Sequence, residues 1–183
     1  MRAPQGAEIL NGVFDLLNEI MRCQSADAMV AAIAMAYVFI DTMAFLAMPG
    51  GQTIQTRKDF ISWVDTYLKT DPSQPYQYRG LDVYAARCSF LHAFSAEADA
   101  HRKDPSVRRF GYSDNGPHAF DPAEPTRLVI ISVAFLIRDL CMATERFFCD
   151  WASDHALRAR VTSRLLALYN TFPITAVTSA TAR

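Results

Sequence analysis

Apolar residues recur at intervals of three and four along most of the chain, which is the period of an α-helix that buries one face. This pattern predicts a first amphipathic helix over about 9–21 and a second helix over 25–48, with Ser25 as its N-cap. Thr56 and Asp59 have the spacing of a capping box, which predicts that a third helix begins beside them. Three further helices are expected over 81–94, about 126–150 and about 153–170.

One segment, residues 96–125, interrupts the helical pattern with prolines, glycines and charged residues. Within it, 109–112 and 118–120 flank the turn-forming residues 113–116, which predicts a short hairpin. An irregular insert of this length is unusual in a compact domain and often has a functional role. The expected fold is therefore all-α: an antiparallel helical bundle of five to six helices, with a long irregular insert at about 96–125.

Length and composition suit a single globular domain. The chain has 183 residues, and its 51% hydrophobic content with 20% charged residues excludes intrinsic disorder, because there is enough apolar surface to form a core. We expect one bundle domain over 1–174 and a flexible C-terminal tail over 175–183. The formal net charge of -1 argues against binding to nucleic acid through overall charge, so such binding needs a local basic patch.

The four cysteines lie far apart and form no CxxC pair, which favours reduced thiols over a metal or disulfide site. No stretch near the start of the chain has the pattern of a secretory signal. Gly50 and Gly51 lack the lysine and the spacing of a phosphate-binding loop. We therefore expect a cytoplasmic protein that uses no metal and no cofactor.

Residues 28–48 are long enough and apolar enough to cross a bilayer, and only Asp41 and Thr42 among them are polar. In a membrane, Asp41 would lie in hydrocarbon at a cost of about 2.5–3.5 kcal/mol. Alanine, which is common in this segment, favours insertion only weakly, and neither flank is clearly basic. A buried bundle helix in a protein without membrane contact is the preferred interpretation, and insertion is the alternative.

Arg87 and His92 lie five residues apart on a predicted helix that is otherwise largely apolar. An imidazole can transfer protons near neutral pH, and a guanidinium can stabilise negative charge on a phosphoryl group. Together they form a minimal metal-free site, in which His92 acts as a base on a ribose 2′-hydroxyl or as an acid on the leaving oxygen. Such a site cleaves RNA and spares DNA, which lacks the attacking hydroxyl. Five residues correspond to about 140° around an ideal helix, so both side chains must lean toward one cleft.

Other residues are candidates for binding the substrate. Tyr84 lies three residues before Arg87, and Ser89 lies three residues before His92, so each can contribute a hydroxyl. In the insert, a basic patch close to aromatic residues suits phosphates and stacked bases. This patch consists of His101, Arg102, Lys103, Arg108 and Arg109. Acidic residues dilute it, so an ordinary solvated loop is the alternative interpretation.

This helix, in a bundle of this size, resembles the HEPN superfamily (higher eukaryotes and prokaryotes nucleotide-binding domains), whose mark is an R-x4-6-H motif on a late bundle helix. Arg87 and His92 match its shortest spacing. The resemblance implies an all-α bundle that forms a homodimer, with the motifs of both protomers lining one cleft and with Arg87 and His92 as the catalytic pair. Many members are metal-independent endoribonucleases of toxin–antitoxin and defence systems, which implies an RNA substrate and an antitoxin or other protein partner. Active members often have a polar residue directly after the arginine, where this chain has Cys88.

Plainer interpretations of the same residues remain open. Arg87 can form a structural ion pair with Asp41, which also interrupts an apolar helix, and such a pair can equally orient a catalytic site. His92 can be a core or interface histidine. The chain would then be a non-enzymatic helical dimerisation or protein-binding module, as are the HEPN members that have lost the motif.

Overall fold

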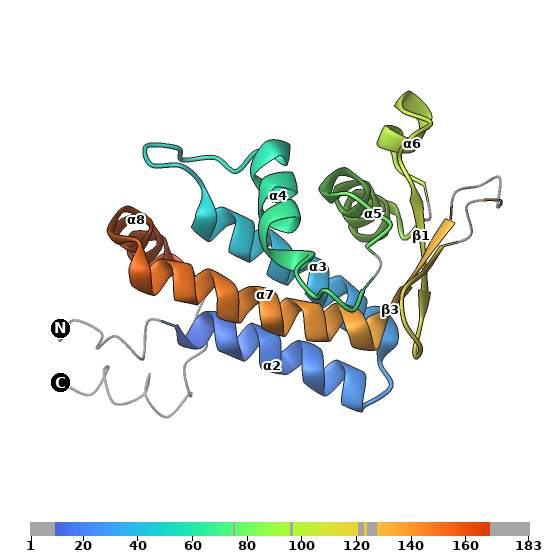
Figure 1. Cartoon of the computed structure of the whole chain (residues 1–183), viewed down its shortest axis with the longest axis horizontal. Helices are drawn as coiled ribbons and strands as arrows, with labels where there is room; N and C mark the ends of the chain where they lie inside the picture. The colour runs from blue at the N-terminus through green and yellow to red at the C-terminus, as the bar shows by residue number, and fades with distance from the viewer. Residues whose placement is uncertain (1–9, 75, 96, 121–122, 124–127, 169–183) are drawn as a thin grey trace, which may run out of the picture.

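The computed structural model describes residues 10–74, 76–95, 97–120, 123 and 128–168, and it is mostly helical (Figure 1). The helices are α2 (Asn11–Ser25), α3 (Met29–Ala47), α4 (Arg57–Trp63), α5 (Gly80–Ala93), α6 (Asp99–Lys103), α7 (Val133–Ser153) and α8 (His155–Leu165), and a π-helical segment, η1 (Val64–Leu68), continues α4. The strands are β1 (Arg109–Ser113), β2 (Ala119–Phe120) and β3 (Leu128–Ser132). The expected, mostly helical fold is thus confirmed, but the fold is not purely α-helical because it contains a small three-stranded sheet.

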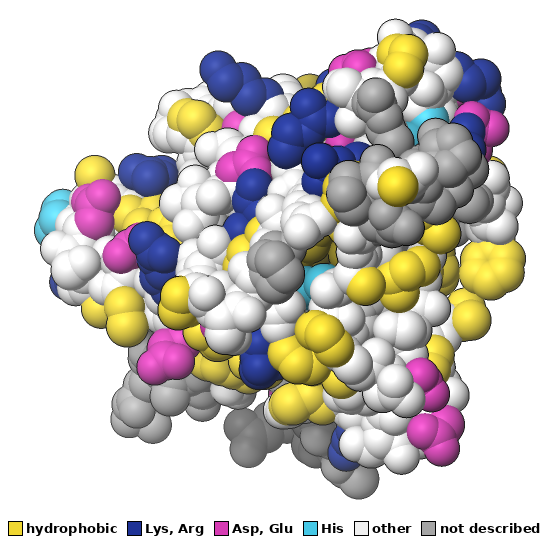
Figure 2. All heavy atoms as spheres, turned by 45° about the vertical axis from the view of Figure 1, so that its right-hand side comes forward, with side chains coloured by type: hydrophobic (Ala, Val, Ile, Leu, Met, Phe, Trp, Pro, Cys, Tyr) yellow, Lys and Arg dark blue, Asp and Glu magenta, His cyan; other side chains and the backbone are white. Residues whose placement is uncertain are grey.

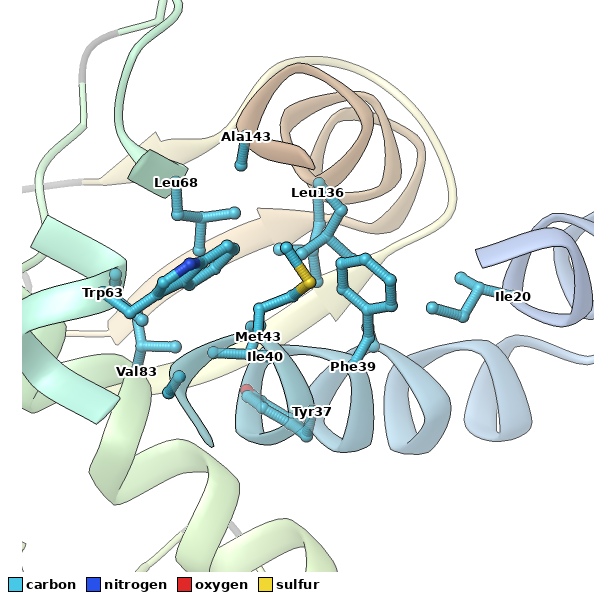
Figure 3. Packing of buried hydrophobic residues seen from close by; sticks show 14 of the residues in the cluster. Ile20, Tyr37, Phe39, Ile40, Met43, Trp63, Leu68, Val83, Leu136 and Ala143 are labelled. Atoms are coloured by element: carbon cyan, nitrogen blue, oxygen red, sulfur yellow. The ribbon is translucent and has the colours of Figure 1, made fainter. Parts of the chain in front are cut away.

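The core is built around α3, which contacts α2, α4, α5, α7 and α8. Its apolar side chains point in most directions, as expected for a helix with neighbours on several sides. Figure 3 shows Phe39 and Met43 of α3 lying among Ile20 of α2, Trp63 of α4 and Leu136 of α7. Each fully buried large apolar side chain contributes roughly 1.5–3 kcal/mol, so this cluster holds the helices together.

The same helix, α3, is the candidate membrane span of the described residues. It is 19 residues long with a mean hydropathy of 2.0 over its most apolar window, and 50% of that window is buried inside the molecule. By length and composition it can cross a bilayer, and a core helix passes the same test.

The predicted helix starts were correct at one cap and wrong at another. Thr56 and Asp59 form the expected capping box at the start of α4, where the Asp59 N–H bonds the Thr56 hydroxyl at 3.4 Å and the Asp59 carboxylate accepts from the Thr56 N–H at 2.7 Å. Ser25 does not cap α3. It is the last residue of α2, and its hydroxyl donates to the carbonyl of Met21 at 2.9 Å, while α3 begins four residues later at Met29.

The start of α5 packs closely against α4, and a glycine makes this approach feasible. A Cβ on Gly80 would lie 2.6 Å from the carbonyl oxygen of Ile61, and the Gly80 N–H donates to Asp65 at 2.9 Å. Asp82, fully buried in the first turn of α5, accepts from the backbone N–H groups of Arg79 at 2.8 Å and of Arg108 at 3.0 Å. These contacts fix α5, which carries Arg87 and His92, between α4 and the insert.

The insert contains strands, but not the predicted hairpin. β1 and β2 do not pair with each other, because β3 lies between them: β1 pairs with β3 in parallel, and β2 pairs with β3 antiparallel. The expected helix from about residue 126 was therefore wrong over 128–132, which form β3. Leu-Val-Ile-Ile is a continuous apolar run rich in β-branched residues, which suits a central strand. Ser132 then caps α7 by accepting from the Phe135 N–H at 3.4 Å.

The last helix is shorter than expected. α8 begins after Asp154, whose carboxylate accepts from the N–H groups of Ala156 at 2.8 Å and Leu157 at 3.1 Å. It ends at Leu165 instead of extending to about residue 170, and the expected tail over 175–183 lies outside the described residues.

Candidate functional site

Arg87, Asp41 and His92 meet where α3 and α5 pack together, and Arg87 is the central member of this group. The Nε of Arg87 donates to Oδ2 of Asp41 at 2.8 Å, and the Nη2 of Arg87 lies 2.7 Å from the same oxygen. On the other side, Nη1 of Arg87 lies 3.0 Å from Nε2 of His92. We call these three residues the Arg87 group.

Helix geometry explains how Arg87 and His92 come together. Five residues advance about 7.5 Å along a helix and turn by about 140°, so the two residues lie on neighbouring turns but not on one stripe. The long arginine side chain spans this gap. His92 lies in the last turn of α5, just before Phe94 leaves the helix with a left-handed φ of 44°. The expected pairing of Arg87 with Asp41 and the expected approach of Arg87 to His92 are both present.

The Arg87 group is partly open to solvent. The side chains of Arg87 and Asp41 are 22% and 26% exposed, and His92 is exposed. Part of this group is therefore accessible from solvent.

Hydrogen bonding indicates the protonation of His92. The guanidinium of Arg87 has only donors, so Nε2 of His92 is the acceptor in their 3.0 Å contact. The ring is then neutral, with its proton on Nδ1. In this form, Nε2 carries the lone pair that a general base needs, and release of the Arg87 N–H makes that lone pair available.

The ion pair also sets the charges of its two members. Burial raises the pKa of Asp41, and the hydrogen bond and charge of Arg87 oppose this rise without cancelling it. Burial lowers the pKa of Arg87, but the hydrogen bond and charge of Asp41 outweigh it, so the net pKa is raised. Arg87 therefore stays charged, and Asp41 holds it in one orientation.

Tyr84 and Cys88 adjoin the Arg87 group on the same helix. The Tyr84 ring packs edge-on against Phe60 of α4, with 5.5 Å between the ring centroids. Burial and a hydrogen bond with the Cys88 thiol raise the pKa of Tyr84, so its hydroxyl remains a neutral donor. The Cys88 thiol also contacts the guanidinium of Arg87. The four cysteines of the chain are free thiols.

Ser89 does not join this site. Its side chain points into the bundle, it is 3% exposed, and its hydroxyl donates to the carbonyl of Ala86 at 2.9 Å. It is therefore closed to a substrate, and its expected binding role has no support in the geometry.

The basic patch of the insert is largely neutralised. Arg102 forms an ion pair with Asp99, and Arg109 pairs with Glu97 at 2.7 Å. Arg108 stacks over the Phe120 ring, with 4.4 Å from its guanidinium carbon to the ring centroid, and Lys103 is exposed on α6. Figure 2, which brings this side forward, shows Lys and Arg side chains spread over the upper half of the face with Asp and Glu among them.

Arg57 also adjoins the site, and no pattern in the sequence indicates that it does. It is the exposed first residue of α4, and its guanidinium carbon lies 5.6 Å from the centroid of the Tyr84 ring. Only the packing of α4 on α5 brings together residues that are 27 positions apart, so no local pattern reveals this contact.

A second titratable pair, His118 and Asp139, lies in the core. The His118 Nε2 is 3.2 Å from Oδ2 of Asp139, and its Nδ1 accepts from the Ser132 N–H at 3.1 Å. Nε2 therefore carries the proton and donates to Asp139. The two side chains are 2% and 0% exposed and both ring nitrogens are engaged, so this pair joins the insert to α7 and offers no open site.

No cluster of three or more His, Cys, Asp and Glu side chains suited to a metal ion occurs within the described ranges. The chain matches no family model, no curated protein and no solved structure. The function is therefore argued from the geometry of the Arg87 group.

Proposed function

We propose that this protein is a metal-independent endoribonuclease of the HEPN type, with Arg87 and His92 as its catalytic residues. The observation that carries the proposal is the 3.0 Å contact between the guanidinium of Arg87, which Asp41 holds, and the imidazole of the exposed His92. These are the two groups that phosphodiester cleavage by an internal 2′-hydroxyl requires.

In the proposed reaction, the substrate phosphate takes over the Arg87 N–H that Nε2 of His92 accepts. The freed lone pair of Nε2 then takes the proton of a ribose 2′-hydroxyl, which attacks the adjacent phosphorus. The bond from phosphorus to the 5′-oxygen breaks, and the leaving oxygen takes a proton from water. The products are a 2′,3′-cyclic phosphate and a 5′-hydroxyl. Arg87 keeps N–H donors on Nη1 and Nη2 beyond those that face His92 and Asp41, and these stabilise the charge on the phosphoryl oxygens.

The test is cleavage of a single-stranded RNA in the presence of a chelator. Removing one catalytic group typically costs about 10²–10⁴-fold in rate, so Arg87→Ala and His92→Ala should each lower cleavage by at least about 100-fold. Arg158→Ala is the matched control, because Arg158 is an exposed arginine on α8 that packs over the Trp151 ring and lies outside the Arg87 group. Cleavage that is unchanged in both site variants contradicts the proposal.

The resemblance also implies a cytoplasmic homodimer of toxin or defence type, with an antitoxin or other protein as partner. Support for a self-association surface comes from a hollow of about 1110 Å³, lined mainly by α2 and α3, in which apolar side chains such as Leu16, Met35 and Val38 lie among polar ones. Val38 and Thr42 of α3 line this hollow, and the three residues of the Arg87 group do not.

The second candidate function is a non-enzymatic helical module that binds a second copy of this chain. The same hollow favours it, because Met21 and Val38 remain 37% and 41% exposed there, and exposed apolar surface often marks a binding site. In this case Arg87 and Asp41 form only a structural pair, and the Arg87 variants lose stability without losing an activity.

A further inference from the structure

Arg57 extends the positive charge of the Arg87 group from α5 onto α4. Its guanidinium carbon lies 5.6 Å from the centroid of the Tyr84 ring, which is within the range of a cation–π contact. Tyr84 in turn lies one helical turn before Arg87, so the two residues share a face of α5. The Tyr84 ring is thus flanked by Arg57 on α4 and by Arg87 on α5.

Arg57 also has the charge that a phosphate-binding residue needs. It is exposed, and within the described ranges its side chain forms no ion pair with a carboxylate. Arg102 and Arg109 of the insert, by contrast, are both paired with acidic residues. Binding of a phosphate by Arg57 therefore does not have to break an existing ion pair.

The contact with Tyr84 restricts where the Arg57 guanidinium lies. A guanidinium that rests on an aromatic ring keeps its edge N–H groups free to bind phosphate oxygens. The Tyr84 ring is itself held edge-on by Phe60 at 5.5 Å. Sites that bind single-stranded nucleic acid combine cations along the backbone with aromatic rings in this way.

We propose that Arg57, positioned by Tyr84, binds a second phosphate of a single-stranded RNA whose scissile phosphate lies at Arg87 and His92. This inference rests on the proposed function and adds a substrate-binding residue to it. Its expected effect is on substrate affinity, because Arg57 contacts a phosphate that takes no part in the reaction.

The experiment measures binding of a short fluorescent single-stranded RNA by anisotropy over a range of salt concentrations. A His92→Ala background prevents cleavage during the measurement. Adding Arg57→Ala should weaken binding about tenfold at low salt and reduce the slope of log K against log salt by about 0.7, the value for one phosphate contact on a single strand. Arg57→Gln should do the same, and Arg57→Lys should retain the slope because it retains the charge.

The control is Arg158→Ala in the same background. Arg158 is an exposed arginine of α8 whose guanidinium carbon lies 6.0 Å from the centroid of the Trp151 ring, and α8 lies on the left in Figure 1, away from α5. Equal binding by the Arg57→Ala and Arg158→Ala proteins overturns the Arg57 assignment and leaves the proposed nuclease intact. Absence of RNA binding in the His92→Ala protein itself overturns both. In the cleaving protein, Arg57→Ala should raise KM and leave kcat nearly unchanged.

Discussion

Arg87 makes two contacts, one that concerns the stability of the fold and one that concerns catalysis. Its bond to Asp41 is a structural ion pair, which the sequence predicted because each residue is a charge on an apolar helix. Its contact with His92 is the one that the proposed catalysis needs. One side chain serves both, because Nε faces α3 while Nη1 faces the end of α5. The structural pair is therefore no argument against a catalytic role, since it also fixes the orientation of the guanidinium.

The ion pair predicts a measurable coupling between Asp41 and Arg87. The side chains of Arg87 and Asp41 are 22% and 26% exposed, so their ion pair is intermediate between a surface pair and a buried pair. A surface pair contributes about 0.2–1 kcal/mol, and disruption of a buried pair costs about 3–5 kcal/mol. A double-mutant cycle with Asp41→Ala and Arg87→Ala, measured by urea unfolding, should give a coupling of about 1–2 kcal/mol. Additive effects of the two substitutions contradict a stable ion pair.

At the scale of whole elements, the sequence predicted the helices well because their signals are local. Apolar spacing and the capping box located α4, and the helix expected over 81–94 agrees with α5 to within one residue at each end. β3 was missed because an unbroken apolar run has no period that separates a strand from a buried helix. The start of α3 was misplaced because Ser25 has the residue type of an N-cap but lies inside the last turn of α2.

For the site, too, local sequence signals were predictive and contacts that depend on tertiary packing were not. The sequence predicted the ion pair of Asp41 with Arg87 because each is a charge that interrupts an apolar helix, and buried charges need partners. Ser89 has the right spacing from His92 but faces the core, since the face of a helix that packs inward depends on its neighbours. Arg57 reaches Tyr84 only through tertiary packing, which no spacing along the chain encodes.

The N-cap of α8 predicts a pH dependence of stability. Hydrogen bonds from the N–H groups of Leu157 and Ala156 hold the pKa of Asp154 below its usual value. A carboxylate whose pKa is lowered by folding stabilises the protein above its unfolded pKa, near 4, and this contribution is lost as the pH falls. Asn caps a helix about as well but does not titrate. The free energy of unfolding should therefore fall more steeply from pH 6 to pH 3 in the wild type than in Asp154→Asn.

Two parallel pH profiles from chemical unfolding would contradict this account of the cap. At pH 6 the wild type and Asp154→Asn should unfold at similar urea concentrations, because both side chains accept the same backbone N–H groups.

For the whole molecule, the hollow between α2 and α3 predicts self-association. Burying Val38 in an interface favours a dimer, and a charge at that position opposes it. In analytical ultracentrifugation, the wild type should sediment as a dimer and Val38→Asp as a monomer. Ile54→Asp is the matched control, because Ile54 is 76% exposed and lies outside the hollow. A wild-type monomer, or a dimer that Val38→Asp leaves intact, contradicts this surface.

The most direct test of the nuclease compares two oligonucleotides that differ in one atom. The first is a single-stranded RNA in which the cleavage position has been mapped, and the second has a 2′-deoxyribose at that position alone. With a chelator present, the wild type should cut the first to a 2′,3′-cyclic phosphate and a 5′-hydroxyl and leave the second intact, and His92→Ala should cut neither. Cleavage of both oligonucleotides at the same position, or no cleavage of the first by the wild type, contradicts catalysis by Arg87 and His92.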